Sequence, residues 1–346
     1  MAPFSKYNRN SKTMASQKIT TSKAKPLPPG VYTPVITIYD NTPTQQVDLD
    51  AMYKHCQYLV NAGCHGLVYL GTNGELAMLN HQERIDIVKM ARKAVTDLGI
   101  PDYPILAGIS AQSVAETIQL AKEAGEAGAA WGLLLPPSYW TKAINPKVLE
   151  GYYRDVADAS PIPIVIYNYP GVVSGVDLDS DIICALASHP NIVAAKLTCG
   201  QVGKAIRVTS RYGPQHMAVY AGSADYLVPS LVGGASGCVV GMGNVFPKTV
   251  SRLYDYYKAG RLNEAAALQE KISVAEAACK KSLNSTKWGA WYYILRNLGI
   301  ESDAGFAMRK PYLSPGEEQK KSALAAFSIL EDIEKSMQGR EGIFKA

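Results

Sequence analysis

The chain has 346 residues, 47% of them hydrophobic and 19% charged, enough to bury the core of one large α/β barrel or of two smaller domains. Its net charge of +5 comes from the N-terminus, because the first 29 residues contain six basic side chains and no acidic one. The remainder is nearly neutral, which argues against a body that binds nucleic acid through a basic face. No run approaches about 20 apolar residues, so the sequence predicts no membrane-spanning helix and no membrane partner.

Cysteine and histidine spacing argues against a metal site. The six cysteines are scattered without a C-x-x-C pair, and the five histidines form neither H-x-x-H nor H-E-x-x-H. This spacing is typical of buried, reduced thiols rather than of a disulfide framework or a zinc site. We therefore expect an intracellular, metal-free globular protein.

Residues 1–29 form a segment of Ser, Thr, Lys and Asn with few large apolar side chains. Such a segment cannot bury enough surface to offset its ordering entropy, so we expect a disordered basic tail. A basic, acid-free leader is also typical of a mitochondrial transit peptide, although this one holds a single arginine, Arg9. We expect a cytoplasmic protein, with the mitochondrion as the alternative, and a folded body that begins near Gly30.

From Gly30 onward, short apolar runs alternate with longer stretches of helical periodicity. The runs begin 19 to 37 residues apart, which is typical of βαβ units. Eight such units predict an α/β fold, a (β/α)8 TIM barrel over residues 30–258. The predicted strands are Val31–Ile38, Gly66–Leu70, Tyr103–Gly108, Trp131–Leu135, Pro163–Tyr167, Ile192–Lys196, Ala218–Ala221 and Gly237–Val240.

Capping residues mark the predicted helices between these strands. Asp48 precedes an amphipathic run, and two pairs have the spacing of a capping box, namely Asn80 with Glu83 and Ser113 with Glu116. Three glycines are typical of helix ends: Gly63, Gly125 and Gly128.

Residues 259–346 follow the eighth strand and predict a C-terminal helical extension. Ala259-Gly260 breaks the last barrel helix, and three further helices are predicted over Glu264–Leu283, Thr286–Leu298 and Glu317–Met337. The second of them is rich in Trp and Tyr, which we interpret as core packing, with ligand binding as the alternative. We expect the extension to cover an edge of the barrel or to build a subunit contact.

Lys196 stands out because it ends a strand of buried pattern, Ile192-Val193-Ala194-Ala195, where an ammonium group is costly. Either a carboxylate pairs with it, or desolvation lowers its pKa and leaves a neutral amine that can form a Schiff base with a ketone. The nearest acids upstream and downstream are Asp181 and Asp225, and this separation favours the neutral amine. A lysine at a strand end can also extend its amine to solvent.

Two further strand ends carry polar groups. Tyr167 ends the fifth strand with a phenol that can shuttle a proton, although strand tyrosines more often only pack. Gly71-Thr72-Asn73-Gly74-Glu75 follows the second strand, and its exposed N–H groups suit a small carboxylate. The alternative is an ordinary βα turn in which Asn73 adopts a left-handed conformation.

Three of these segments together carry a family resemblance. Gly71–Glu75, Tyr167-Asn168-Tyr169-Pro170-Gly171 and Lys196, in this order and spacing, resemble the dihydrodipicolinate synthase / N-acetylneuraminate lyase family. The resemblance extends over most of the folded body and includes the segments Asn80–Arg84 and His189–Val193. It implies a (β/α)8 barrel with a C-terminal helical extension, assembled as a homotetramer (a dimer of dimers), that acts as a pyruvate-handling class I aldolase without a metal or organic cofactor.

The resemblance also implies roles for individual residues. Lys196 would form the Schiff base, Tyr167 would move protons there, and Thr72 would take part in the relay to that tyrosine. Tyr139 would reach into the site of the neighbouring subunit. The positions that would hold the pyruvate carboxylate or line the pocket are Asn73, Gly74, Gly222 and Val239.

Details of the motifs favour one branch of the family. The synthase branch carries an arginine shortly after the Tyr-x-x-Pro motif, whereas this chain has Gly171-Val172-Val173-Ser174-Gly175, which offers no bidentate contact to a carboxylate. Gly71–Glu75 and Ala221–Ala224 are similar to 4-hydroxy-2-oxoglutarate aldolases. Lys196–Gly200 is similar to fungal aldolases of 2-keto-3-deoxy sugar acids, such as L-threo-3-deoxy-hexulosonate aldolase.

We therefore expect an enzyme, a lyase that cleaves a 4-hydroxy-2-oxo or 2-keto-3-deoxy acid into pyruvate and an aldehyde. Glyoxylate and glyceraldehyde are the two aldehydes that the resemblance suggests, and the neutral 171–175 segment favours the uncharged one. Dihydrodipicolinate synthase or another pyruvate-condensing member stays open as an alternative, as does a non-catalytic ligand-binding barrel.

Overall fold

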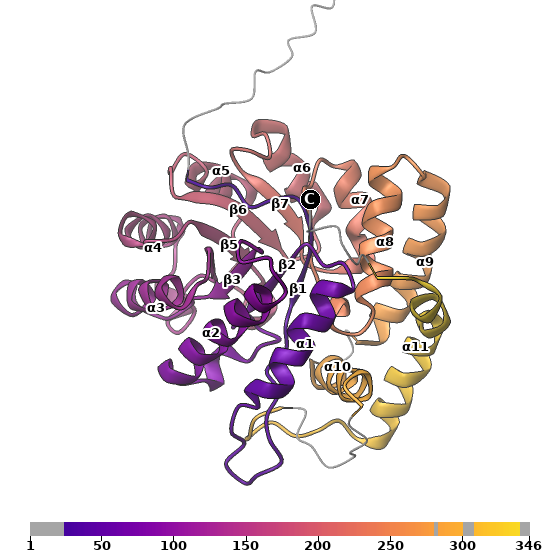
Figure 1. Cartoon of the computed structure of the whole chain (residues 1–346). Coiled ribbons are helices and arrows are strands. Elements are labelled where there is room, and N and C mark those ends of the chain that lie inside the picture. The colour runs from indigo at the N-terminus through magenta and orange to yellow at the C-terminus, as the bar shows by residue number, and fades with distance from the viewer. Residues whose placement is uncertain (1–23, 280–282, 300–307, 340–346) are drawn as a thin grey trace, which may run out of the picture.

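The computed structural model describes residues 24–279, 283–299 and 308–339. Within these residues, eight parallel strands run in chain order around a closed barrel (Figure 1). The strands are β1 (Gly30–Pro34), β2 (Gly66–Tyr69), β3 (Ile105–Gly108), β4 (Trp131–Leu134), β5 (Ile164–Asn168), β6 (Ile192–Leu197), β7 (Ala218–Ala221) and β8 (Gly237–Val239). The predicted barrel is confirmed.

The barrel closes where β8 pairs with β1, and two glycines meet there. A Cβ atom at position 237 would lie 1.9 Å from the carbonyl oxygen of Gly30, so only glycine permits this approach. The first strand is shorter than the predicted run Val31–Ile38. It ends at Pro34, which has no N–H to contribute to the ladder.

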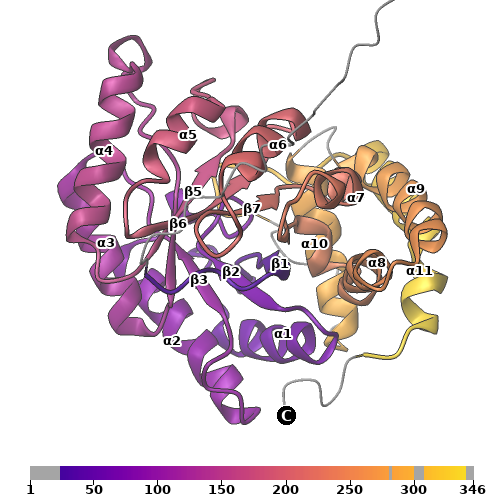
Figure 2. The ribbon, with the colours of Figure 1, turned by 90° about the horizontal axis from the view of Figure 1, so that it is seen from above.

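A helix follows each strand on the outside of the barrel, and together these helices form a ring (Figure 2). One apolar cluster lies between the ring and the strands, while a second fills the barrel interior with side chains such as Val68, Leu106 and Val193. The helices of the ring are α1 (Leu49–Asn61), α2 (His81–Asp97), α3 (Val114–Ala127), α4 (Pro146–Ala159), α5 (Ser180–Leu186), α6 (Val202–Arg211), α7 (Leu227–Val232) and α8 (Pro247–Lys258).

The predicted helix starts agree with the structure, with one difference. Asp48 caps α1, and Asn80 caps α2 in a complete capping box with Glu83. Ser113 accepts a hydrogen bond from the Glu116 N–H at the start of α3, as predicted. The Glu116 carboxylate, however, contacts the His81 ring at 2.9 Å, so its side chain has a partner outside the predicted box.

Of the three glycines predicted at helix ends, Gly128 has the expected role. It ends α3 in a left-handed conformation with φ of 110°. Gly63 follows the last residues of α1, also with positive φ. The prediction for Gly125 is wrong, because α3 continues through it to Ala127. At Gly125 an added Cβ would lie 3.1 Å from Ile162, so this glycine permits close packing rather than ending the helix.

Residues 24–29 correct the predicted disordered tail, because they lie against the barrel. Leu27 is 2% exposed and belongs to the interior cluster. The indole N–H of Trp131 donates to the carbonyl of Lys25, and the Tyr220 hydroxyl donates to the carbonyl of Leu27. Aromatic donors inside the barrel thus hold a segment whose composition alone predicts disorder. Residues 1–23 lie outside the described residues, and the division at 29 and 258 stays a prediction.

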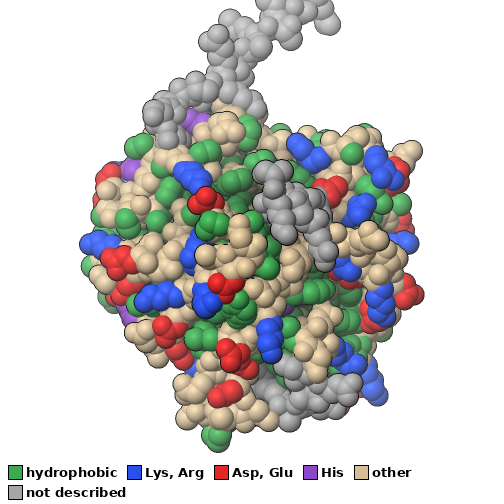
Figure 3. Space-filling view, viewed as in Figure 1, with side chains coloured by type: hydrophobic (Ala, Val, Ile, Leu, Met, Phe, Trp, Pro, Cys, Tyr) green, Lys and Arg blue, Asp and Glu red, His purple; other side chains and the backbone are tan. Residues whose placement is uncertain are grey.

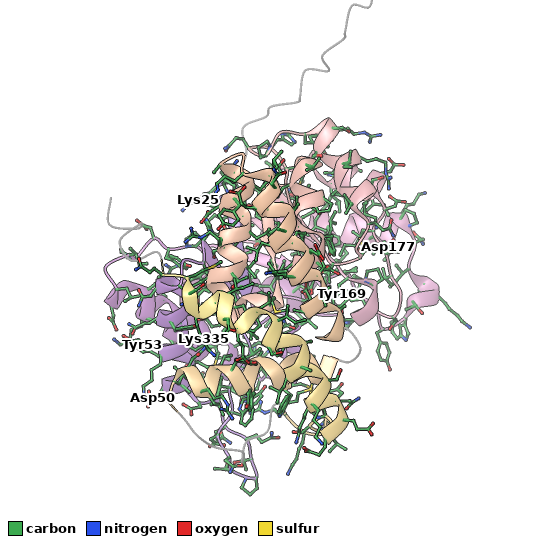
Figure 4. All side chains as sticks on the ribbon, turned by 90° about the vertical axis from the view of Figure 1, so that its right-hand side faces the viewer. Lys25, Asp50, Tyr53, Tyr169, Asp177 and Lys335 are labelled. Atoms are coloured by element: carbon green, nitrogen blue, oxygen red, sulfur yellow. The ribbon has the colours of Figure 1, made fainter. Side chains whose placement is uncertain are left out.

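The described C-terminal helices are α9 (Leu262–Cys279), α10 (Leu283–Asn297) and α11 (Glu317–Ser336). Figure 4 faces this side of the molecule and shows α9 and α11 side by side over the barrel. The prediction placed Leu283 at the end of the helix that precedes α10, whereas in the structure Leu283 is the first residue of α10. Trp288 and Trp291 are buried in the core, which confirms the packing interpretation of the aromatic run. None of the described helices has the length and apolar composition needed to cross a bilayer.

Charged side chains of both signs are interspersed on the face shown in Figure 3. Other charged side chains are buried and join the extension to the barrel, and Glu334 of α11 is one of them. Helix α8 starts at Phe246-Pro247 without a capping side chain of its own. The Glu334 carboxylate accepts hydrogen bonds from the N–H groups of Lys248 (3.0 Å) and Thr249 (2.7 Å) and from the Thr249 hydroxyl. An acid from α11 therefore caps the N-terminus of α8.

Replacement of Glu334 by alanine should destabilise the protein by about 1–3 kcal/mol, because the capped donors would stay buried without acceptors. The measurement is the urea midpoint of unfolding. Asp332→Ala is the matched control, since Asp332 is an exposed acid two residues earlier on the same helix. Equal midpoints for the two variants would contradict the capping role.

Candidate active site

Lys196 lies at the carboxyl end of β6, in register with Tyr167 of β5. Its side chain is 4% exposed, and its Nζ lies 4.1 Å from the centre of the Tyr167 ring. Asp181, the nearest acid upstream, lies 3.6 Å from Arg211 instead. Burial, with no ion pair to a carboxylate in the described part of the chain to oppose it, lowers the pKa of Lys196 to about 7. The structure thus favours the neutral amine over a buried ion pair or a solvated side chain.

Tyr167 is also buried, and its hydroxyl lies 3.2 Å from the Thr72 hydroxyl. Burial raises the pKa of Tyr167 to about 12, against the opposing effect of the Thr72 and Thr198 hydroxyls. The phenol is therefore protonated at neutral pH. Lys196, Tyr167 and Thr72, predicted from three separate strand ends, are thus brought together by the barrel, as parallel strands require.

The turn after β2 holds Thr72 and Asn73 at the barrel mouth through a left-handed residue, Glu75, with φ of 53°. The Glu75 carboxylate is buried, pairs with Lys287 of α10 and accepts a hydrogen bond from the Arg309 N–H at 2.9 Å. Residues from the C-terminal extension therefore anchor this turn. Motif reasoning missed Lys287 and Arg309, because they lie more than 200 positions after Glu75 and no sequence pattern around them indicates a contact with this turn.

A cavity of about 400 Å³ opens beside these residues at the barrel mouth. It has a size suited to a small organic acid. Its described lining residues are Pro34, Thr72, Asn73, Tyr167, Tyr169, Lys196, Thr198, Cys199, Gly200, Gly222, Ser223, Tyr226, Val239, Gly241, Met242, Val245, Glu276 and Phe327. Six of the eight positions expected to act at the site line this cavity, whereas Gly74 and Tyr139 do not.

Asn73, Gly222 and Val239 line the cavity as expected, whereas Gly74 is not among its lining residues. The Gly74 carbonyl accepts a hydrogen bond from the Thr37 hydroxyl at 2.7 Å. Gly222 is required by close packing: a Cβ there would lie 2.0 Å from the Thr198 hydroxyl. These substrate-binding assignments stay predictions.

Tyr139 follows β4 on the outer surface, 78% exposed, next to the equally exposed Trp140. It lines a separate groove that also includes Pro137, Ser138 and Val148. Within one chain it does not reach the cavity, which is the geometry expected of a residue that serves a neighbouring subunit. Its role stays a prediction.

Twelve lining residues had no role assigned from the sequence, among them Ser223, Tyr226, Glu276 and Phe327. Ser223 follows the predicted Gly222 directly, at a strand end where polar groups were expected. Tyr226 lies one turn further, and its hydroxyl donates to the carbonyl of Leu197 at 2.7 Å. Glu276 and Phe327 come from α9 and α11, and no motif connects these helices with the barrel mouth.

The described side chains offer no group of three or more His, Cys, Asp or Glu residues arranged to hold a metal ion. The cysteines whose side chains are described are free thiols. What the cavity offers instead is a nucleophile, the Lys196 amine, and an adjacent pair of hydroxyls that can pass a proton.

A family model described as "Dihydrodipicolinate synthetase family" matches residues 27–329. A Coccidioides immitis (strain RS) protein named as a mitochondrial 4-hydroxy-2-oxoglutarate aldolase is 40% identical over 308 residues, which is 88% of this chain and 96% of that one. L-threo-3-deoxy-hexylosonate aldolase of Aspergillus niger is 35% identical over 338 residues, covering 90% of this chain and 98% of the relative.

Solved structures are similar as well. The crystal structure of a dihydrodipicolinate synthase family protein from Coccidioides immitis has a TM-score of 0.82 and 36% identity, covering 92% of this chain and all of that one. A prophage protein of the same family from E. coli K12, solved in complex with pyruvate, has a TM-score of 0.77 and 26% identity over 87% of this chain and 98% of its own.

The lowered pKa of Lys196 predicts a pH-dependent stability. Because a lysine in the unfolded chain titrates near 10.5, the unfolded state binds more protons than the folded state between about pH 7 and 10.5, so stability rises with pH there. The stability of the wild type relative to Lys196→Met should therefore be about 3 kcal/mol lower at pH 6 than at pH 9.

Tyr167, with a pKa of about 12, does not titrate in this range. Urea unfolding of both proteins at several pH values measures the difference. A difference that stays constant between pH 6 and 9 would show that the amine is solvated in the folded protein.

Proposed function

Because the chain belongs to the dihydrodipicolinate synthetase family, we propose that it is a class I aldolase, a lyase that releases pyruvate and an aldehyde from a 4-hydroxy-2-oxo or 2-keto-3-deoxy acid. One observation carries the proposal above all. Lys196 is buried with no carboxylate partner among the described residues, at a pKa of about 7, in the wall of a cavity of substrate size. An amine in that state is a nucleophile at neutral pH.

In the proposed reaction the Lys196 amine attacks the C2 ketone, and loss of water forms an imine. The protonated imine withdraws electrons, so the C3–C4 bond breaks once the C4 hydroxyl loses its proton. The aldehyde leaves, the enamine takes up a proton at C3, and hydrolysis of the imine releases pyruvate and restores the amine. The covalent adduct is itself the electron sink, so the reaction needs no metal or organic cofactor.

Tyr167 and Thr72 are the proposed proton carriers. The phenol is protonated at neutral pH, so it can accept the C4 proton only as it passes its own proton onward. Its neighbour at 3.2 Å is the Thr72 hydroxyl, and we assign Tyr139 of a second subunit to the far end of this relay. Asn73 and Gly74, as substrate-binding residues, would hold the pyruvate carboxylate, and Gly222 and Val239 would line the pocket.

The aldolase assignment is preferred to dihydrodipicolinate synthase on charge. Lys196 is the single basic residue among the described lining residues, and the segment 171–175 holds no arginine. A second carboxylate on the substrate would therefore meet no cation. A non-catalytic binding barrel is disfavoured, because binding alone does not require an unpaired buried amine beside two hydroxyls.

The assembly and the compartment are further parts of the proposal. The exposed Tyr139-Trp140 pair favours a subunit contact there, in line with the expected homotetramer. The cytoplasmic location stays a prediction, whereas two relatives carry "mitochondrial" in their names, which favours the alternative.

Borohydride trapping tests the nucleophile. Incubation with pyruvate and borohydride should add the mass of one reduced pyruvate to the wild type and none to Lys196→Ala. Because only the neutral amine attacks, the rate of trapping should rise with pH through about 7. Lys204→Ala is the control, since Lys204 is a buried lysine paired with Asp177 and should leave Lys196 trapping intact. Absence of the adduct in the wild type would sink the aldolase proposal.

Subunit mixing tests Tyr139. Lys196→Ala and Tyr139→Ala should each be inactive alone, whereas co-expressed subunits should regain up to about a quarter of wild-type pyruvate release, since one site in each mixed dimer is complete. The control pairs Lys196→Ala with Tyr167→Phe, which should not complement, because both residues lie in the same chain's cavity. No recovery in purified mixed oligomers would place Tyr139 outside the shared site.

A further inference from the structure

The turn that presents Thr72 is strained at both of its ends. Leu70, just before the turn, and Glu75, at its close, adopt the left-handed conformation, with φ of 57° and 53°. This conformation is unfavourable for residues that carry a Cβ, and it persists only where the surrounding structure enforces it. The contacts that enforce it therefore decide where the Thr72 hydroxyl lies.

The first end of the turn is held within the barrel. The carbonyl of Leu70 lies against Gly108 of β3, where an added Cβ would be 1.7 Å from the carbonyl oxygen. Only glycine at this position leaves room for the left-handed residue. Strand packing thus fixes this end of the turn.

The second end is held by the C-terminal extension. The Glu75 side chain is 6% exposed, and its two oxygens have different partners. Oε1 pairs with the ammonium group of Lys287, which is itself fully buried, and Oε2 accepts from the Arg309 N–H at 2.9 Å. Loss of either charge of this buried pair would leave the other one uncompensated.

The Arg309 side chain holds the segment that follows the turn. Its guanidinium group donates to the Met78 carbonyl, at the end of η1 (Leu76–Met78), at 2.8 Å, and to the Glu83 carboxylate at 2.9 Å. A further hydrogen bond of 2.7 Å goes to the Gln45 carbonyl. Lys287 and Arg309 therefore form a clamp that fixes both Glu75 and the exit of the turn.

The clamp reaches the proposed proton carriers through the backbone. The Glu75 N–H donates to the Thr72 carbonyl at 3.1 Å, across the turn. The Thr72 hydroxyl lies 3.2 Å from the Tyr167 hydroxyl, whereas hydrogen bonds between hydroxyl groups are usually about 2.7–2.8 Å long. A displacement of Thr72 by about half an ångström would therefore break this contact.

We propose that Glu75 is a positioning residue for proton transfer and that Lys287 and Arg309 hold it in place, so that the C-terminal extension sets the distance between Thr72 and Tyr167. The inference rests on the proposed aldolase function and deepens it with residues that touch neither the substrate nor the reacting atoms. Lys196 lies on β6, outside this clamp, so the pyruvate imine should still form when the clamp is broken.

The clamp acts on the step that converts this imine into the enamine. In that step the C3–H bond breaks, and its electron pair forms the C2–C3 double bond and neutralises the iminium nitrogen. The proton enters the relay of Tyr167 and Thr72. Misplacement of Thr72 should therefore slow proton transfer at C3 more than it affects the attachment of pyruvate.

Exchange of the pyruvate methyl protons in D2O isolates this step, because exchange needs the enamine but no aldehyde. At saturating pyruvate, followed by proton NMR, Lys287→Met should exchange at least tenfold more slowly than the wild type. Glu75→Gln keeps the acceptor for the Arg309 N–H and should exchange several-fold more slowly. The double variant should be no slower than Lys287→Met alone, since both changes break one contact.

Borohydride trapping of pyruvate at Lys196 provides the second readout. Lys287→Met and Glu75→Gln should reach the same final amount of trapped pyruvate as the wild type, which also shows that the variants are folded. Failure of the wild type to trap pyruvate overturns the aldolase function itself. Normal trapping together with wild-type exchange in Lys287→Met, or losses that multiply in the double variant, overturns the positioning role alone.

Glu334→Ala is the matched control for a general loosening of the extension. It also removes a buried acid that joins the extension to the barrel, but the described hydrogen bonds of Glu334 go to α8 and not to the turn. Its exchange rate should equal that of the wild type. An equal loss in Glu334→Ala and Lys287→Met would overturn the positioning role. If Lys287→Met does not fold, Glu75→Gln decides by the same two measurements.

Discussion

This site depends on the burial of one amine, that of Lys196, which pairs with no carboxylate in the part of the chain that the structure describes. An ion pair would stabilise the ammonium form of Lys196 and remove its nucleophilicity, whereas full exposure would restore a pKa above 10. The barrel avoids both, because β6 buries the amine at the barrel mouth, beside the ring of Tyr167. The surrounding parallel strands, buried on both faces, supply the stability that offsets the cost of burying this amine.

The C-terminal helices complete the barrel rather than standing beside it. Glu334 of α11 caps α8, and Lys287 of α10 pairs with Glu75 at the base of the turn that presents Thr72. Glu276 of α9 holds the segment after β7 and lines the cavity. Each contact places a charged group where a helix end or a buried turn offers a complementary partner. Site geometry and attachment of the extension are therefore coupled.

Local chemistry explains which features were predictable. Strand positions and the caps at Asp48 and Asn80 depend on neighbouring residues, so alternation and capping patterns identify them. Residues 24–29 and Gly125 were misjudged, because their environment comes from distant partners: Trp131 and Tyr220 hold the segment 24–29, and Ile162 packs on the glycine. Composition carries no information about such partners.

The amino-acid order was enough to indicate a (β/α)8 barrel and to single out Lys196, because a charged group that ends a buried strand is conspicuous in its own neighbourhood. The expected roles of Tyr167 and Thr72 came from the family resemblance. The amino-acid order could not indicate that Gly74 bonds to Thr37, or that α9 and α11 bring Glu276 and Phe327 to the cavity. Those contacts join residues tens to hundreds of positions apart. They exist only once the barrel has closed and the extension has packed on it, since hydrogen bonds and desolvation depend on distance in space and not on distance along the chain.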